Sequence, residues 1–332
     1  MSKQKICVIS FDHWNYDNHI VKTLQKKGIK SLHINIGAFK HRNFWEQAKN
    51  AFSKVFLNKN NKTIKRQQYL LDTLLHIGKQ DQILVINPEL ISKECHLEIK
   101  KYTSKYIAYL YDSVARCPVE HLLNGVFDSI YSFDSDDVDK YNFIKTSNYI
   151  YTPKKEFSLT EKTKYQAFYL ASYDNRLAFL YQIKKKLDEI DVSYLFIVVG
   201  KKGIFKKLQS LFLFSKKSSL LKFQKKRIKQ ENIEKYYVKT NVIFDLIRNN
   251  QTGLSFRVFE AMAHQKKLIT NNETIVNYDF YNPNNILVIN EKNINFEKAF
   301  FSTPYQPIPE TIYNKYTLDS WVDTVFELKN KE

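Results

Sequence analysis

The chain has 332 residues, with 52 Lys or Arg against 34 Asp or Glu and a formal net charge of +18. Its 43% hydrophobic content excludes a disordered chain, and its length favours two domains over a single core. The three cysteines form no CxxC pair and no apolar run approaches about 20 residues, which argues against a disulfide framework, a zinc cluster and a membrane span. The positive charge favours phosphorylated substrates, nucleic acid or an anionic membrane as partners.

The first half of the chain alternates short apolar runs with helix-like stretches. Apolar residues at helical spacing predict two helices within residues 40–80. Alternating strands and helices indicate βαβ units around a parallel sheet. The expected strands cover residues 6–11, 31–36, 82–87, 106–111 and 129–133.

The second half repeats this alternation after a polar stretch, residues 150–166, which contains Pro153 and is interpreted as the interdomain linker. Helices are expected at about 175–190 and 255–264, and a terminal helix is expected to pack back across the domains. The expected strands cover residues 167–172, 193–200, 241–247, 267–272 and 286–290. We therefore predict an α/β protein with Rossmann-like domains at 1–152 and 153–315 and a terminal helix at 316–332.

The most informative stretch, residues 241–272, is predicted to form a strand, a glycine turn, a helix and a strand. Glycine in the turn lets backbone N–H groups approach a ligand, and the positive end of the helix dipole can hold a diphosphate. A glutamate one turn into the helix can accept hydrogen bonds from ribose hydroxyls. The alternative is a capped core helix on which Arg257 and Glu260 form a surface pair. The candidate residues are Gln251, Thr252, Gly253, the helix cap Ser255, Arg257 and Glu260.

The segment TGLSFRVFEAMAHQKKLITNN resembles the donor-binding region of GT-B glycosyltransferases, in which a glycine turn leads into a helix whose glutamate binds the nucleotide ribose. Retaining members often place a second glutamate eight residues earlier, where this sequence has Thr252. Together with YDSVARCP and FDSIYSFDSDDVDKYN, the segment resembles a group of capsule and lipopolysaccharide biosynthesis proteins. The resemblance implies a GT-B fold, with two Rossmann-like domains whose parallel sheets face a central cleft.

The sequence LASYDNRLAFL, residues 170–180, begins the second domain and offers another candidate ligand loop. Ser172 and Asp174 are expected to cap the following helix, with Arg176 in its first turn, where a phosphate would lie at the strand ends. The resemblance implies that this loop approaches the donor diphosphate. The alternative is an ordinary capping motif with a solvated arginine.

Strand ends in the first domain carry Asp12, His13 and Asp17 in one loop, and Asp112 in another. A carboxylate or imidazole beyond a strand end can serve as the general base that an inverting transferase needs on its acceptor hydroxyl. We rank Asp112 ahead of Asp12 and His13 because the resemblance includes its segment. The competing interpretation is that these residues only cap loops or bind acceptor hydroxyls.

Asp134, Asp136 and Asp137 have the spacing of a DxD metal motif. They follow a strand and open a helix, where carboxylates favour the dipole, so we expect helix capping and no metal. No zinc-ligand spacing, GxSxG elbow or P-loop is present.

A basic segment, residues 201–229, interleaves lysines with apolar residues and contains no acidic residue. It suits the surface of an anionic bilayer, with lysines at the head groups. A solvated pair of helices packed on the second domain is the equal alternative.

The sequence thus predicts a metal-independent glycosyltransferase without a cofactor, whose substrates are a nucleotide sugar and a hydroxyl of a bacterial surface glycan. The glycan would be capsule, lipopolysaccharide or a lipid-linked oligosaccharide. We expect a cytoplasmic protein that binds the inner face of the membrane through residues 201–229 and binds no nucleic acid. The alternatives are a nucleic-acid-binding protein, motivated by the charge and the 22 tyrosines and 24 phenylalanines, and an inactive GT-B scaffold.

Overall fold

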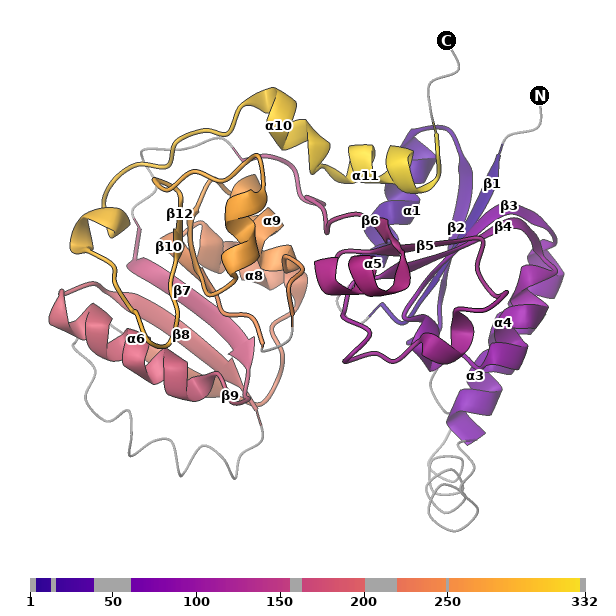
Figure 1. The fold of residues 1–332 in the computed structure, drawn as a ribbon, viewed down its shortest axis with the longest axis horizontal. Helices are drawn as coiled ribbons and strands as arrows, with labels where there is room; N and C mark the ends of the chain where they lie inside the picture. Colours follow the sequence, from indigo (N-terminus) through magenta and orange to yellow (C-terminus); the bar gives the residue numbers. More distant parts are fainter. Residues whose placement is uncertain are drawn as a thin grey trace. The chain divides into compact units, whose positions relative to one another are not determined.

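The chain folds into two compact units, which are shown in Figure 1. The first comprises Met1–Ser147 and Leu318–Glu332, and the second comprises Asn148–Thr317. Each contains one six-stranded sheet in which every pair of neighbouring strands is parallel. The predicted α/β class with two parallel sheets is therefore confirmed. The structure, a computed structural model, describes residues 4–12, 16–38, 61–155, 163–200, 220–248 and 251–328.

The sheet of the first unit has the strand order β2-β1-β3-β4-β5-β6. The chain adds β2 on one side of β1 and then crosses to add β3 on the other, so the order reverses between β1 and β3. The strands are β1 (Lys5–Ser10), β2 (Lys30–Asn35), β3 (Gln80–Ile86), β4 (Thr103–Leu110), β5 (Ser129–Ser132) and β6 (Ile144–Lys145). The helices are α1 (Asp17–Lys26), α3 (Asn61–Ile77), η1 (Pro88–Leu90), α4 (Lys93–Lys100), η2 (Glu120–Leu122), α5 (Ser135–Tyr141) and α11 (Leu318–Val325).

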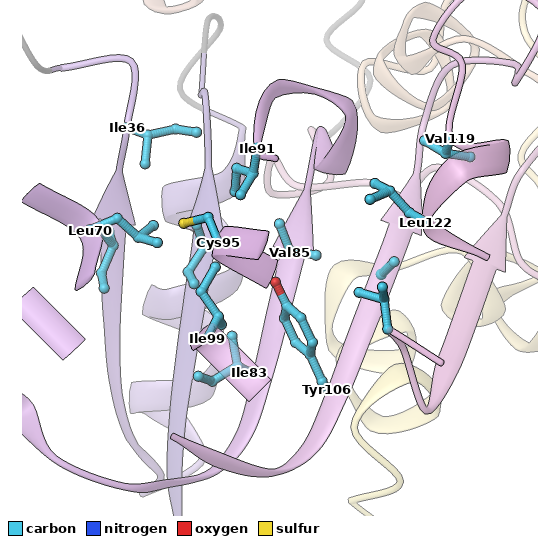
Figure 2. Close-up of a cluster of buried hydrophobic side chains, with 14 of the residues drawn as sticks. Ile36, Leu70, Ile83, Val85, Ile91, Cys95, Ile99, Tyr106, Val119 and Leu122 are labelled. Carbon is cyan, nitrogen blue, oxygen red and sulfur yellow. The ribbon is translucent and has the colours of Figure 1, made fainter. Parts of the chain in front are cut away.

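Helices cover both faces of this sheet, which explains why the strands are apolar runs without alternation. Cys7 and Ile9 of β1 belong to a core cluster that α3 and α4 close with Leu70 and Ile99; Figure 2 shows part of this cluster. His96 of α4 is buried there, and its Nδ1 lies 2.7 Å from the hydroxyl of Tyr106. One apolar cluster thus joins strands β1 to β4 with helices α3 and α4 of the unit.

The terminal helix α11 belongs to the first unit although it follows the second along the chain. Trp321 packs edge-on against Tyr109 of β4, with the ring centroids 5.0 Å apart. Gln82 of β3 donates to the Phe326 carbonyl at 2.9 Å, and Lys27 forms a 3.0 Å ion pair with Asp323. The predicted terminal helix is therefore present and closes the first unit.

The sheet of the second unit has the strand order β12-β11-β10-β7-β8-β9. Counted along the chain within this unit, the order is 6-5-4-1-2-3, which is that of the doubly wound Rossmann fold. The strands are β7 (Tyr165–Ser172), β8 (Tyr194–Val199), β9 (Leu220–Gln224), β10 (Thr240–Asp245), β11 (Lys267–Thr270) and β12 (Ile286–Val288). The helices are α6 (Leu177–Glu189), α8 (Gln230–Tyr237), α9 (Phe256–Ala263), η4 (Glu273–Asn277), η5 (Lys298–Phe301) and α10 (Glu310–Lys315).

Alternate residues of the second sheet pack into two different cores. Phe168 of β7 packs in a cluster with α8 and α9, whereas Ala167 and Tyr169 pack in a cluster with α6. Helices α8 and α9 therefore cover one face of the sheet and α6 covers the other, as Figure 1 shows.

One part of the basic segment differs from the expectation. Residues 220–224, the end of the basic segment, form the edge strand β9 rather than a helix, because Leu221 and Phe223 alternate with Lys222 and pack against the α6 side. Residues 201–219 of that segment and the first helix expected within 40–80 lie outside the described residues. No helix within the described ranges is both long enough and apolar enough to cross a bilayer.

The boundary between the units falls between Ser147 and Asn148, so the predicted boundary at residue 152 lies within the second unit. Tyr149, Ile150 and Tyr151, at the start of the expected linker, are buried. Tyr151 donates a hydrogen bond to Glu260 in the second unit. These apolar residues therefore belong to the second core rather than to a solvated linker.

Candidate functional site

In a doubly wound sheet, ligands bind beyond the carboxyl ends of the strands where the strand order reverses. In the second unit this point lies between β7 and β10. The loop after β7 carries Asp174 and Arg176, and the loop after β10 carries Arg248 and leads to α9. Three arginines, Arg176, Arg248 and Arg257, are thus placed on the segments that flank the reversal point.

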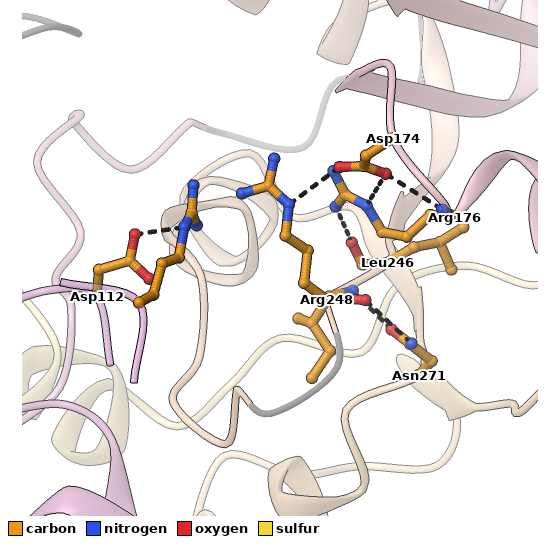
Figure 3. Close-up of polar contacts among 8 residues, drawn as sticks. Asp112, Asp174, Arg176, Leu246, Arg248 and Asn271 are labelled. Carbon is orange, nitrogen blue, oxygen red and sulfur yellow. Dashed lines mark hydrogen bonds and ion pairs between the residues drawn. The ribbon is translucent and has the colours of Figure 1, made fainter. Parts of the chain in front are cut away.

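Asp174 links two of these arginines, as Figure 3 shows. Arg176 donates from Nε to Oδ1 at 2.8 Å and from Nη2 to Oδ2 at 2.6 Å, a bidentate pair. Arg248 donates from Nε to Oδ2 at 3.0 Å. Burial alone would raise the pKa of Asp174, but the hydrogen bonds from Arg176 and Arg248 outweigh it and lower the pKa. The cluster therefore keeps an ionised aspartate with two guanidinium groups.

Hydrogen bonds from two neighbouring loops hold the backbone of the segment that carries Arg248. Arg176 also donates from Nη1 to the carbonyl of Leu246, which ties the loop after β7 to the loop after β10. Asn271, just after β11, accepts from the Ile247 amide at 2.6 Å and donates to its carbonyl at 3.3 Å. In the part of the chain that the structure describes, the terminal nitrogens of Arg248 have no hydrogen-bond partner. The loop thus presents two guanidinium nitrogens that none of the described residues engages.

Side-chain hydrogen bonds also fix the backbone at the N-terminus of α9. Ser255 caps the helix by accepting a hydrogen bond from the Arg257 amide at 3.1 Å, which confirms the predicted cap. Asn272 donates to the carbonyls of Thr252 and Gly253, at 3.1 and 3.2 Å, and Asn148 donates to that of Leu254 at 2.9 Å. Because a trans peptide directs its N–H opposite to its C=O, the amide of the following residue points away from these asparagines.

The side chain of Arg257 points inward rather than to the surface. It lies 4.0 Å from the carboxylate of Asp245 and donates to the hydroxyl of Tyr237 at 3.3 Å. Burial raises the pKa of Asp245, and the positive charges of Arg257 and Arg176 oppose that effect. Arg257 is thus the third guanidinium of the site and is anchored to the end of β10.

Glu260 is buried, with only 3% of its surface exposed. Its Oε1 accepts from Tyr151 and from Gln230, each at 2.6 Å, and its Oε2 accepts from Tyr237 at 2.5 Å. The alternative of a surface pair with Arg257 is therefore wrong, because Tyr237 lies between them and connects the two. A glutamate in this network fixes α9, α8 and residue 151 to one another.

The loop after β7 differs from the expected capping motif. The cap position of α6 is Arg176 itself, and no side chain there accepts a capping hydrogen bond. Asp174 instead binds the guanidinium groups, and Ser172 ends β7. Asp174 also accepts from the Arg176 amide at 3.2 Å, so its side chain does bind the backbone at the start of α6. The expectation differs for the other two residues, because Ser172 lies in β7 and Arg176 stands at the cap position rather than in the first turn. Gln251 lies at the start of the turn that precedes α9 and is partly buried.

The carboxyl edge of the first sheet carries acidic groups around its own reversal point, between β1 and β3. Asp12 follows β1, and Asp17, at the start of α1, is 1% exposed. Neither oxygen of Asp17 has a hydrogen-bond partner among the described residues. Burial raises the pKa of Asp17 to about 8, and the neighbouring Asp12 carboxylate adds to the effect. His13 lies outside the described residues.

Asp112 follows β4 in the first unit and forms a 2.9 Å ion pair with Arg116; Figure 3 includes Asp112. Its charge also contributes to the raised pKa of Glu89, which burial causes in the main. The carboxylate is thus partly exposed but already engaged by a guanidinium.

The aspartates with DxD spacing act as the sequence predicts. The side chain of Asp134 caps α5 by accepting from the amides of Asp136 and Asp137. Asp137 accepts from the Val114 amide at 2.7 Å. In the described residues no group of three or more His, Cys, Asp or Glu is arranged to hold a metal ion.

Three residues of the candidate site in the second unit are not among the residues predicted from the sequence: Asp245, Arg248 and Tyr237. Arg248 could have been found, because it comes directly after the strand predicted at 241–247 and faces the carboxyl edge. Tyr237 lies on α8, a helix that the charge-rich sequence did not reveal.

No protein-family profile and no curated protein sequence matches the chain. Solved structures do resemble it. A lipopolysaccharide outer core galactosyltransferase, WaaB, superposes with a TM-score of 0.53 at 12% identity, covering 98% of this chain and 100% of WaaB. An alpha-glucosyltransferase in complex with UDP and a 13-mer DNA gives 0.58 at 10% identity, covering 99% and 98%.

A UDP-GlcNAc 2-epimerase from Neisseria meningitidis, bound to UDP-GlcNAc, gives a TM-score of 0.54 at 12% identity and covers 98% of this chain and 100% of the epimerase. At such identities the likeness concerns the fold alone. The chain therefore has the GT-B fold, which glycosyltransferases and these epimerases share.

Proposed function

We propose that the chain is a glycosyltransferase that takes a sugar from a nucleotide-sugar donor bound at the β7/β10 reversal point of the second unit. The observation that carries the proposal is the cluster of Asp174, Arg176 and Arg248 on the two loops that flank this point. Guanidinium groups match the oxygens of a diphosphate in geometry and charge. The likeness to solved glycosyltransferases supports the same assignment.

The charge balance of this site favours an anion. Arg176, Arg248 and Arg257 face two carboxylates, Asp174 and Asp245, and burial raises the pKa of the latter. Three guanidinium groups against two carboxylates leave one positive charge, and two where Asp245 is protonated, which an anionic group would compensate. The N-terminus of α9 adds the positive end of a helix dipole at the same edge.

In the proposed reaction, the bond between the anomeric carbon and the diphosphate oxygen breaks, and the anomeric carbon forms a new bond to an acceptor hydroxyl oxygen. The nucleotide diphosphate leaves with the bonding electrons. Arg248 and the α9 amides stabilise that charge, in the role that a divalent ion fills elsewhere. No metal or other cofactor is then required. Glu260 is proposed to accept from the donor ribose, in exchange for one of its present protein donors.

The acceptor hydroxyl must lose its proton, and we assign this step to a carboxylate at the carboxyl edge of the first sheet. Asp112, Asp12 and His13 are the candidates from the sequence. Asp112 is engaged by Arg116, whereas Oδ2 of Asp12 has no hydrogen-bond partner among the described residues. Asp112→Asn and Asp12→Asn variants separate them, because loss of the base lowers kcat about a hundredfold or more while donor affinity is unchanged.

The acceptor is proposed to be a hydroxyl of a bacterial surface glycan: capsule, lipopolysaccharide or a lipid-linked oligosaccharide. Lys225, Lys226 and Arg227, at the end of the basic segment, are exposed in the second unit. These charges support a cytoplasmic enzyme that works at the inner face of an anionic membrane.

The first experiment is a thermal-unfolding screen with UDP-, GDP-, dTDP- and CMP-linked sugars, run on the wild type and on Arg248→Ala. A ligand that binds only the folded state raises the melting temperature, and we expect UDP-sugars to do so in the wild type but less in the variant. Lys292→Ala, an exposed charge removal in the same unit, is the matched control.

Turnover then identifies the reaction. Release of free nucleotide together with a glycosylated acceptor supports a transferase. Isomerisation of the sugar nucleotide without an acceptor would identify an epimerase instead. The absence of a melting shift with all four classes at millimolar concentration would overturn the assignment of the donor site.

A further inference from the structure

The second unit has a cavity of about 430 Å³ on the α8 side of its sheet, at the amino ends of the strands. Tyr165 at the start of β7 and Thr240 at the start of β10 line it. The donor site lies beyond the opposite ends of these strands. An eight-residue strand such as β7 rises about 3.3 Å per residue, so the two sites are roughly 20 Å or more apart.

Four lysines surround this cavity, and no acidic residue lines it. They come from four segments: the residue before β7, the edge strand β9, helix α8 and the turn before β10. All four side chains are exposed. In the described part of the chain none of them forms an ion pair with a carboxylate. The lysines are Lys164, Lys222, Lys235 and Lys239.

Like charges that converge on one cavity repel one another, and an anion bound among them would relieve that repulsion. Lys155, which does not line the cavity, by contrast forms a 2.7 Å ion pair with Glu234 of helix α8. The absence of such partners around the cavity leaves a local positive field. An ammonium group is a compact point charge that binds phosphate.

The floor of the cavity is apolar and ordered by packing. Phe168 of β7 and Tyr236 of α8 stack with their rings 5.4 Å apart and 9° from parallel. Leu195 of β8 completes the floor. A cavity with an apolar floor and a cationic rim suits a ligand that has a charged head and an apolar or sugar-like body.

We propose that this cavity is a second, non-catalytic binding site for a phosphorylated ligand, whose phosphate or diphosphate is held by Lys164, Lys222, Lys235 and Lys239. The volume of about 430 Å³ accommodates a diphosphate and the group that carries it. The ligand is either the head group of an anionic lipid or a soluble phosphorylated molecule, since both present the same charge. The inference stands apart from the donor site and does not depend on it.

The test is calorimetric titration with inorganic pyrophosphate at 100 mM salt, where charges more than about 10 Å apart are largely screened. The cavity variant is Lys164→Ala/Lys239→Ala. The matched control is Lys185→Ala/Lys292→Ala, which removes two exposed lysines of the same unit outside the cavity. Arg248→Ala reports on pyrophosphate bound at the donor site. The lysines are exposed and Arg248 is only partly buried, so each variant is expected to fold, and far-UV circular dichroism checks this.

We expect pyrophosphate to bind the wild type with a Kd below about 1 mM, and the cavity variant to bind at least tenfold more weakly. The control and Arg248→Ala should retain a binding event of near wild-type affinity. Equal weakening in the cavity variant and the control, loss confined to Arg248→Ala, or no binding to the wild type would overturn the proposal.

Vesicles distinguish the two sources of the phosphate. Co-sedimentation is measured with phosphatidylcholine vesicles that contain 20 mol% phosphatidic acid. If the head group is the ligand, the cavity variant sediments much less than the control. If the two variants sediment equally while pyrophosphate binding still depends on the cavity, the ligand is a soluble phosphorylated molecule.

Discussion

Asp17 gives the sharpest prediction for stability, because its carboxylate is buried at the carboxyl edge of the first sheet with neither oxygen hydrogen-bonded among the described residues. Burial and Asp12 raise its pKa from 3.8 to about 8. Between these values the folded state binds a proton that the unfolded state has lost, so stability falls as the pH rises. The Asp17→Asn variant removes this titration while keeping the shape of the side chain.

The size of the effect follows from the pKa. At about 1.4 kcal/mol for each pH unit, a change from 3.8 to about 8 corresponds to an upper limit of about 5 to 6 kcal/mol. The free energy of unfolding of Asp17→Asn, relative to wild type, should therefore rise steadily from pH 5 to pH 8. Below about pH 3 both side chains are neutral in both states, so the difference between the proteins should be constant there.

The assay is urea denaturation followed by tryptophan fluorescence at a series of pH values. All three tryptophans, at positions 14, 45 and 321, belong to the first unit, so the signal reports on that unit alone. Asp139→Asn, an exposed carboxylate of the same unit, is the control. If the stability difference between Asp17→Asn and wild type is the same at pH 5 and pH 8, the raised pKa is wrong.

Three further changes test the site and the packing. Arg248→Ala should weaken UDP binding about tenfold or more in calorimetry, because its terminal nitrogens have no partner in the described protein. The melting temperature should fall only slightly, since the variant loses the Nε bond to Asp174 while Arg176 still pairs with that carboxylate; a large loss of stability would show a mainly structural role instead. Glu260→Ala should destabilise the second unit by about 3 kcal/mol, because it leaves the buried donors of Tyr151, Gln230 and Tyr237 without an acceptor. Glu260→Gln should destabilise it less, and equal losses of stability in the two variants, measured by circular dichroism, would contradict the network. Trp321→Ala should destabilise the first unit by about 3 to 5 kcal/mol, and a near-neutral effect in urea denaturation would show that α11 is not part of its core.

The sequence predicts most of the architecture because parallel strands buried on both faces are unmistakable apolar runs. ICVIS and YLFIVV are examples, and each is almost completely buried. The elements that the sequence does not predict are polar or short. The strand β9 and helix α8 lie in a stretch dominated by lysines, and β6 has only two residues.

The candidate site is predictable in position but not in detail. Strand ends and the Ser255 cap follow from local patterns. The contact of Arg176 with Leu246 and that of Glu260 with Tyr151 do not, because they join segments that are 70 and 109 positions apart in the sequence. The burial of Asp17 is also not predictable from the sequence, since a residue in the first turn of a helix is usually exposed.

The central claim is that a nucleotide diphosphate binds at the β7/β10 reversal point of the second unit. Amide hydrogen exchange, measured with and without a saturating UDP-sugar, locates the ligand directly. We predict slowed exchange in residues 173–176 and 251–257, with no change around α11 in the first unit. Binding that leaves both loops unprotected, or that protects another region instead, would contradict the account.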